Sequence, residues 1–176
     1  MPSKSKAKGN SWEYQLCEHL SNIFNLMHTR VPTSGAIFTN AITNKGKKFS
    51  NTQLLLTEGD IIPPDELKNV KYECKNYQSL EFHQILAGSC KLLDTWIEQA
   101  KSDKVWFLAI KITRKGCFIL FDSDRFSYII PENFLHYKHY TIVSLDGFFE
   151  NNKDNILKIN QGTYGISDTS TPALSS

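Results

Sequence analysis

Two short apolar runs near the middle of the chain carry charged residues at a fixed spacing. The first spans residues 59–62 (GDII) and the second residues 72–75 (YECK), with prolines between them at positions 63 and 64. Charged side chains are disfavoured on apolar strands, because burying a charge without a partner costs free energy. The pattern therefore predicts two neighbouring strands of one sheet, at 60–62 and 70–74, whose charges serve a chemical purpose.

Strand geometry brings two of these charges together. Glu73 and Lys75 are two positions apart, so their side chains point to the same face of the sheet, while Cys74 points to the other. Asp60 joins them only if the strand register brings it alongside, and the sequence leaves that register open. The alternative is a surface strand on which Glu73 and Lys75 satisfy one another.

These residues suit the hydrolysis of a phosphodiester bond. The reaction needs neutralised charge on the phosphoryl oxygens, an activated water and a stabilised leaving oxygen, and a divalent metal can supply all three. Mg²⁺ prefers hard oxygen ligands and keeps several waters, so two carboxylates such as Asp60 and Glu73 are enough to hold it. Lys75 is placed to orient a water beside the metal.

An amphipathic helix is predicted to begin at Asn10, because apolar residues recur at helical spacing from Trp12 to Met27. Glu13 lies on the line of this helix that faces the core. Its partner is either local, with Asn10 as the N-cap of a capping box, or a metal ion and its waters. Residues 1–9 are rich in Ser and Lys without apolar periodicity, and we expect them to form a flexible basic arm.

The rest of the pattern predicts an α/β domain. A helix is expected over 80–100, with a kink or split at Gly88, followed by a strand at 105–112 that is buried on both faces. A turn at 114–116 leads into a strand at 117–121, and a further strand is expected at 139–145. The result is a mixed central sheet flanked by helices, with extra C-terminal strands. We predict one domain over 10–145 and a C-terminal extension over 146–176, disordered from residue 161.

Basic residues form three clusters although the formal net charge is only +2. The clusters could contact phosphate backbone, or they could be solvated lysines that keep a small domain soluble. They are the arm with Lys4, Lys6 and Lys8, the stretch with Lys45, Lys47 and Lys48, and the turn with Arg114 and Lys115.

The four cysteines lack any CxxC pair, which argues against both a zinc knuckle and a disulfide framework. No apolar run approaches the length of a signal peptide core or of a membrane span. We therefore expect a soluble, cytoplasmic protein with reduced thiols and no membrane partner.

Four segments of the chain resemble the PD-(D/E)XK nuclease superfamily, and more narrowly its archaeal-type and phage-encoded Holliday-junction resolvases. They are residues 8–13, with Lys8 and Glu13, residues 30–35 (RVPTSG), residues 59–61 (GDI) and residues 73–75 (ECK); residues 98–99 (EQ) are a weaker fifth match. The first acidic motif is Gly-Asp here rather than Pro-Asp. The resemblance covers roughly residues 8–122 and implies a restriction-endonuclease-like αβββαβ core.

The resemblance also implies roles for single residues. Lys75 would orient the nucleophilic water, Ser34 would lie near the scissile phosphate, and Arg30 would contact the DNA backbone. Gln99 would support the site from its helix. Resolvases of this kind are homodimers that nick two opposed strands of a four-way DNA junction. Three acids would hold Mg²⁺, directly or through water: Glu13, Asp60 and Glu73. Mn²⁺ would substitute for Mg²⁺.

We therefore predict a Mg²⁺-dependent DNA endonuclease selective for branched DNA. Residues 36–58 form a longer stretch than the compact archaeal pattern, and residues 123–176 have no counterpart. A second interpretation is thus a homing or restriction-type endonuclease that reads bases in the major groove with these segments. A third is a non-catalytic nucleic-acid-binding protein, although such a module has no use for carboxylates that face phosphate. The composition, rich in Asn, Lys and Ile, points to a phage or a bacterial mobile element.

Overall fold

The computed structural model describes residues 4–31, 58–126 and 133–159, with side chains from residue 11 onward. Its helices are α1 (Lys4–Phe24), α4 (Phe82–Leu86), α5 (Lys91–Ala100) and α6 (Phe148–Lys158), with short 3₁₀ turns η1 (Asp65–Leu67) and η2 (Asp124–Phe126). Its strands are β1 (Thr29–Arg30), β2 (Ile61–Ile62), β3 (Val70–Tyr77), β4 (Val105–Ile112), β5 (Gly116–Asp122), β6 (Phe134–Tyr137) and β7 (Tyr140–Ser144).

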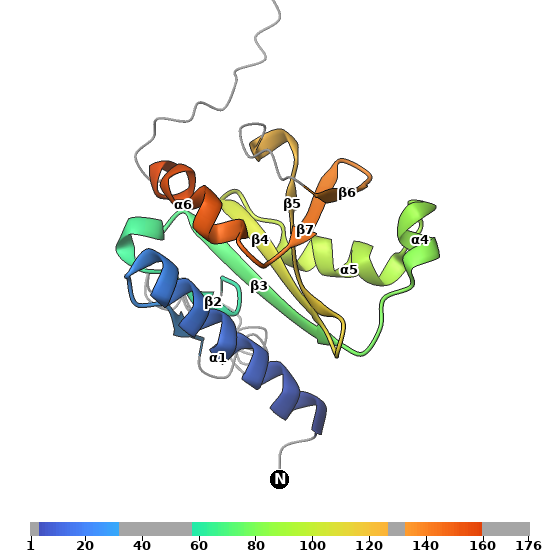
Figure 1. Cartoon of the computed structure of the whole chain (residues 1–176), viewed down its shortest axis with the longest axis horizontal. Coiled ribbons are helices and arrows are strands. Elements are labelled where there is room, and N and C mark those ends of the chain that lie inside the picture. Colours follow the sequence, from blue (N-terminus) through green and yellow to red (C-terminus); the bar gives the residue numbers. More distant parts are fainter. Residues whose placement is uncertain (1–3, 32–57, 127–132, 160–176) are drawn as a thin grey trace, which may run out of the picture.

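Within these residues the strands form one seven-stranded sheet in the order β1-β2-β3-β4-β5-β7-β6 (Figure 1). β3 and β4 run parallel, and the other neighbouring pairs are antiparallel. A parallel pair needs a crossover connection, which α4 and α5 provide. The mixed sheet with flanking helices confirms the predicted fold class, and it is consistent with a restriction-endonuclease-like fold.

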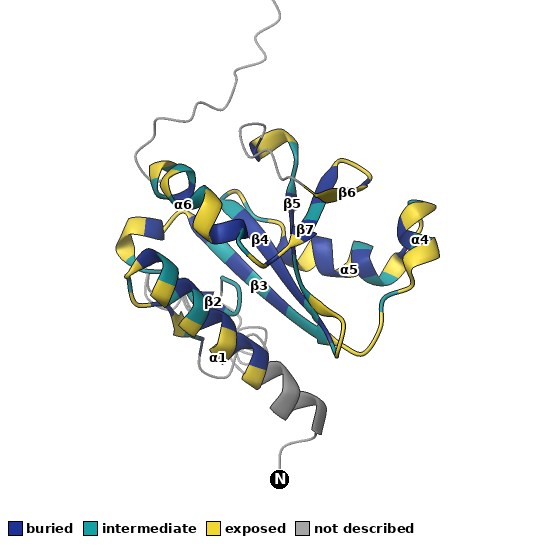
Figure 2. Ribbon diagram, in the orientation of Figure 1, coloured by how far each residue is buried: buried dark blue, intermediate teal, exposed yellow. Residues whose placement is uncertain are grey.

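The sheet separates two apolar cores. Helices α1 and α6 pack against one face, and α5 packs against the other. β4 supplies alternate side chains to both, with Phe107 in the first core and Leu108 in the second. Figure 2 accordingly shows β4 buried along most of its length. This confirms the prediction of a strand that is apolar on both faces.

Two predicted breaks are present where glycine or turn chemistry indicated them. Gly88 lies between α4 and α5 with a φ of +65°, a left-handed conformation that glycine adopts without strain. Between β4 and β5 the chain turns at Arg114, whose φ is +63°. The split helix and the hairpin are both confirmed.

Helix α1 begins at Lys4, six residues before the predicted start. Its first turns lack an apolar stripe, but Lys and Ala are good helix formers, and local propensity extends a helix that is anchored further along. Asn10 is therefore inside the helix and cannot act as its N-cap. The predicted capping box between Asn10 and Glu13 is wrong, because Glu13 lies several residues beyond the first turn.

The predicted element order lacks α6 and β6. Phe149 of α6 is fully buried and packs against the rings of Phe24, Tyr72 and Phe107, with centroid separations of 6.3, 6.2 and 5.5 Å. Asparagines and charged residues fill the exposed positions of α6 and dilute its apolar signal. Residues 146–159 thus complete the core beside α1, whereas the predicted disordered tail lies outside the described residues.

Candidate active site

Asp60 lies beside Glu73 because β2 and β3 are antiparallel, with Ile61 opposite Tyr72. The backbone N–H of Asp60 donates to the Tyr72 carbonyl at 2.9 Å. One Asp60 carboxylate oxygen, Oδ2, in turn accepts the backbone N–H of Cys74 at 2.8 Å. The register that the sequence left open therefore places the Asp60 carboxylate next to the strand that carries Glu73 and Lys75.

Gly59 explains why the first acidic motif is Gly-Asp. Its φ is +83°, and a Cβ at this position would lie 2.5 Å from the Tyr72 carbonyl oxygen. Proline fixes φ near −65°, so the Pro-Asp form of the motif cannot adopt this backbone. Glycine permits the close approach of β2 to β3 that delivers Asp60 to its neighbours.

Glu73 and Lys75 share one face of β3, as their spacing predicts. The Lys75 ammonium donates to Glu73 Oε1 at 2.7 Å, and both side chains are largely buried, with 18% and 13% of Lys75 and Glu73 exposed. Cys74 points to the opposite face and joins the core beneath α1. The strand thus offers a carboxylate and an ammonium side by side within reach of Asp60.

Glu13 reaches the same region from α1 and is only 8% exposed. Its Oε2 accepts a hydrogen bond from Nε of Arg30, the second residue of β1. The Arg30 guanidinium also lies over the ring of Tyr14, with its Cζ 5.5 Å from the ring centroid. Glu13 therefore has a definite partner in Arg30, and its role toward a metal stays a prediction.

Asp60 repels both Glu73 and Glu13 in a poorly solvated region. Burial raises the pKa of Asp60, Glu73 and Glu13 above its ordinary value in each case. The charge of Asp60 raises the pKa of both Glu73 and Glu13 further. Lys75 and Arg30 offset this only in part, and a cation bound between the acids would relieve it. Clustered carboxyls with raised pKa values are typical of functional sites.

The donor set fits a hard divalent cation. Carboxylate oxygens are the ligands that Mg²⁺ prefers, and two of them suffice when waters and phosphate complete the octahedron. Among the residues that the structure describes, no group of three or more His, Cys, Asp or Glu side chains is arranged to hold one metal ion. Asp60 and Glu73, which meet across β2 and β3, offer two such carboxylates.

Lys71 is a neighbour that the sequence interpretation missed. It lies two positions before Glu73, so the same alternation that pairs Glu73 with Lys75 puts all three on one face. Its Nζ donates to the carbonyl oxygens of Gln99 at 2.8 Å and Lys101 at 3.4 Å, at the end of α5. Burial lowers the pKa of Lys71. The Gln99 side chain is exposed, so in this structure Gln99 contributes its backbone carbonyl to the link between α5 and β3.

The predicted DNA-contacting residues are described only in part. Arg114 and Lys115 are exposed at the tip of the β4–β5 hairpin. This tip lies at the end of β3 that follows Lys75, because the N–H of Thr113 donates to the Tyr77 carbonyl at 2.9 Å. Lys8 lies early in α1, and its side chain is not described. The remaining residues, all outside the described part of the chain, are Ser34, Lys45, Lys47 and Lys48.

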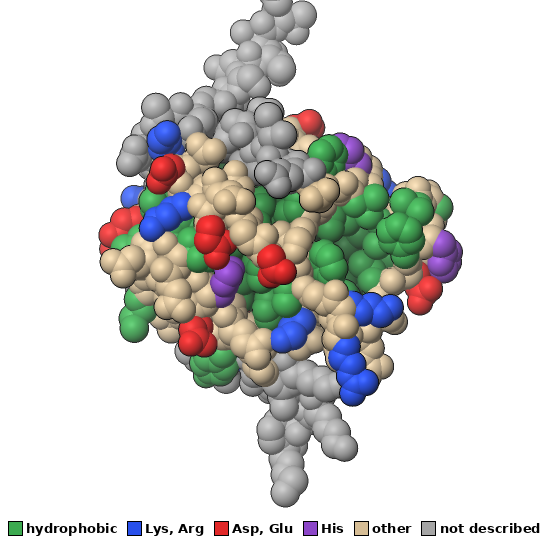
Figure 3. Space-filling view, viewed as in Figure 1, with side chains coloured by type: hydrophobic (Ala, Val, Ile, Leu, Met, Phe, Trp, Pro, Cys, Tyr) green, Lys and Arg blue, Asp and Glu red, His purple; other side chains and the backbone are tan. Residues whose placement is uncertain are grey.

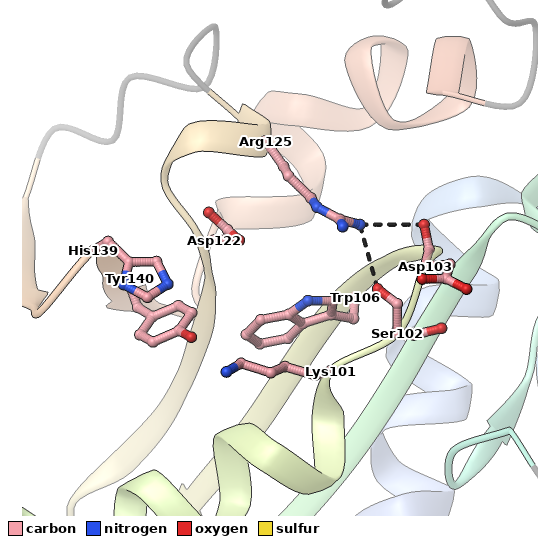
Figure 4. A pocket seen from close by; sticks show the side chains of 8 residues that line it. All are labelled: Lys101, Ser102, Asp103, Trp106, Asp122, Arg125, His139 and Tyr140. Atoms are coloured by element: carbon pink, nitrogen blue, oxygen red, sulfur yellow. Dashed lines mark hydrogen bonds between the residues drawn. The ribbon is translucent and has the colours of Figure 1, made fainter. Parts of the chain in front are cut away.

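Two hollows lie away from this cluster. An apolar groove of about 510 Å³ runs between α4, β5 and β6, and Figure 3 shows hydrophobic side chains gathered there. A polar pocket of about 530 Å³ lies at the other end of the sheet, where Arg125 donates to the carbonyls of Ser102 and Asp103 at 3.3 and 3.2 Å (Figure 4). Neither is lined by Asp60, Glu73 or Glu13.

Comparison with known protein families identifies the chain. The family model described as "Phage putative PDDEXK endonuclease" matches residues 4–159, which includes every element from α1 to α6. The chain belongs to this family. Its membership supports the resemblance to the PD-(D/E)XK superfamily and indicates a phage endonuclease, an enzyme class that typically uses divalent metals. Comparison with curated proteins and with solved structures gave no match. No helix within the described residues is long and apolar enough to cross a membrane.

Proposed function

We propose that the chain is a Mg²⁺-dependent endonuclease that hydrolyses phosphodiester bonds in DNA. The observation that carries this proposal is the meeting of Asp60 with Glu73 and Lys75 across β2 and β3. Family membership supports the reaction class, and the geometry supplies the residues that would perform it. A bound Mg²⁺ would neutralise phosphoryl charge and lower the pKa of a bound water. Mn²⁺ would substitute for Mg²⁺.

Each residue then has a role that follows from its contacts. The Cys74 N–H fixes one Asp60 oxygen and so orients the carboxylate. Glu73 provides the second carboxylate, with Lys75 holding it in place. A lysine ammonium has three donors, so Lys75 can keep Glu73 and still donate to an attacking water. Arg114 and Lys115 extend a cationic surface beyond the end of β3, where flanking phosphates would bind.

Branched DNA is the proposed substrate, and a homodimer is the proposed form of the enzyme. The support is the resemblance of residues 30–35 and of the two acidic motifs to junction resolvases. One chain carries one such cluster of Asp60, Glu73 and Lys75, whereas resolving a four-way junction requires cuts in two opposed strands. Two copies would provide the two sites, with Ser34 near the scissile phosphate in each.

Cleavage assays on three substrates test the reaction and the substrate separately. Purified protein is offered a labelled four-way junction, its matched linear duplex and a random plasmid, with Mg²⁺ or with EDTA. Preferential cutting of the junction in Mg²⁺ alone is expected. Discrete plasmid bands with an intact junction would instead indicate a sequence-specific endonuclease, and metal-independent binding without cutting would indicate a binding protein.

Glu73→Gln tests the site assignment. The substitution removes the charge but keeps the shape, so cleavage should fall below detection while DNA binding stays near the parental level. Glu150→Gln, on the exposed face of α6, is the matched control and should cut normally. A Glu73→Gln variant that cuts at the parental rate would show that the site lies elsewhere.

A further inference from the structure

Glu13 accepts a hydrogen bond from Arg30, and this contact indicates the role of Glu13 in the site. The carboxylate is almost fully buried, and only 11% of its side chain is exposed, against 13% for that of Arg30. Burial is the largest influence on the pKa of Glu13 and raises it; the hydrogen bond from Arg30 lowers this pKa in part, and the charge of Asp60 raises it further. Glu13 is thus stabilised by its cation and repelled by the acid that it would have to join around a metal.

Arg30 is held from two sides. Glu13 accepts from its Nε, and the ring of Tyr14 lies 5.5 Å from its Cζ. A guanidinium carries five N–H donors in a planar fork, so it can hold a carboxylate at one edge and bind phosphate oxygens with another. Arg30 also belongs to β1, which pairs with β2 at Ile61, the residue after Asp60. The charge of Arg30 also lowers the pKa of Asp60, so a phosphate bound by Arg30 would lie near the Asp60 carboxylate.

We propose that Glu13 is a positioning residue that fixes Arg30 for the scissile-strand phosphate, and that it is not a metal ligand. Within the described part of the chain, the carboxylates that would hold the metal are then Asp60 and Glu73. This inference rests on the proposed endonuclease function, and it departs from the role that the superfamily resemblance implies for Glu13.

A positioning role and a metal-ligand role for Glu13 predict different changes in metal affinity and DNA affinity. If Glu13 acts through Arg30, losing the Glu13 charge frees the long Arg30 side chain, which carries considerable rotamer entropy. DNA affinity should then fall while metal affinity stays. If Glu13 is a metal ligand, its loss should weaken metal binding in the absence of DNA as well.

Metal and DNA binding are measured separately on the full-length chain. Titration calorimetry with Mn²⁺ and no DNA gives the metal affinity, and fluorescence anisotropy of a labelled junction in EDTA gives the DNA affinity. Glu13→Gln should keep its metal affinity within about threefold, because Glu13 accepts from Arg30, whereas the contacts that orient the two metal carboxylates come from the Cys74 N–H and Lys75 and are retained. Its DNA affinity should fall about tenfold, as expected for one charged hydrogen bond to phosphate.

Arg30→Lys is the second variant, because it keeps the positive charge and loses the planar fork. It should weaken DNA binding to a similar degree and leave Mn²⁺ affinity unchanged. Combining Glu13→Gln with Arg30→Lys should weaken DNA binding no more than Arg30→Lys alone, since both changes remove the same contact. Thermal unfolding of each variant checks that the fold is intact. If Glu13→Gln fails to fold, the DNA affinity of Arg30→Lys tests the predicted contact with phosphate instead.

Glu73→Gln distinguishes failure of this inference from failure of the proposed function. It should abolish Mn²⁺ binding. If it does, and Glu13→Gln weakens Mn²⁺ binding to the same extent, Glu13 is a ligand and the inference is overturned. Equal DNA affinities for the parent and Arg30→Lys would overturn it as well. If Glu73→Gln leaves Mn²⁺ affinity at the parental value, the proposed metal site itself is wrong.

Discussion

Replacing Asp60 by asparagine should stabilise the metal-free protein at neutral pH and abolish its response to Mg²⁺. Asparagine keeps an acceptor oxygen, so the 2.8 Å hydrogen bond from the Cys74 N–H, worth about 1 kcal/mol, is retained. What is lost is a partly desolvated charge that repels Glu73 and Glu13. Single stabilising substitutions, including those that improve charge interactions, commonly add about 0.5–2 kcal/mol.

The pH dependence of this effect has a definite sign. Burial raises the pKa of Asp60 above its ordinary value of 3.8, so between these two pKa values the folded state holds a proton that the unfolded state has lost. Parental stability contributed by this group is fully present below pH 3.8 and is lost as the pH rises through the raised pKa. The advantage of Asp60→Asn should therefore be absent at acidic pH and reach a plateau at neutral pH.

Thermal and urea unfolding in EDTA and in Mg²⁺ measure the effect. A gain of about 1 kcal/mol corresponds to a rise in Tm of roughly 2–4 °C for a domain of this size. Added Mg²⁺ should raise the Tm of the parent, because a ligand that binds only the folded state stabilises it, and should not raise that of the variant. Asp154→Asn, on the exposed part of α6, should change neither value.

One result would refute the reasoning. If Asp60→Asn is destabilised in EDTA at neutral pH, the Asp60 charge is structural and its attraction to Lys75, Lys71 and Arg30 outweighs its burial and the repulsion from the other acids. The carboxylate cluster would then be a stabilising ion-pair network rather than a site kept for a cation.

Three further outcomes follow from the packing and the site. Phe149→Ala should cost about 3–5 kcal/mol in urea unfolding, because the ring is fully buried, whereas Phe134→Ala, at a ring 51% exposed, should cost less than about 1 kcal/mol; equal costs would mean that α6 does not belong to the core. His28→Phe should reduce the loss of folding stability on acidification. Burial lowers the pKa of His28 below 6.5, so the unfolded chain takes up the proton at a higher pH than the folded chain does. Identical plots of unfolding free energy against pH for parent and variant would contradict this. Lys75→Met should lower the cleavage rate about 10²–10⁴-fold while calorimetry shows Mn²⁺ still bound; a variant that cuts normally would exclude Lys75 from the reaction.

Local patterns predicted most of the fold. The alternation of side chains along a strand is set by backbone geometry, so the shared face of Glu73 and Lys75 follows from two positions in the sequence. The same holds for the double-sided apolar run of β4 and for the break at Gly88, each of which depends on neighbouring residues alone. Helix α6 and the early start of α1 escaped this approach, because their sequences lack a clear apolar stripe and tertiary packing decides where such helices form.

The sequence by itself determined which chemical groups the site contains, a pair of strand acids with a lysine at fixed spacing. Only the tertiary structure decided how they meet. The register of β2 on β3 brings Asp60 to Glu73, and it depends on the close approach that Gly59 permits. The pairing of Glu13 with Arg30 joins α1 to β1, and the hydrogen bond from Lys71 to the Gln99 carbonyl joins residues 28 positions apart. Contacts between elements arise from packing, which no local pattern in a single sequence encodes.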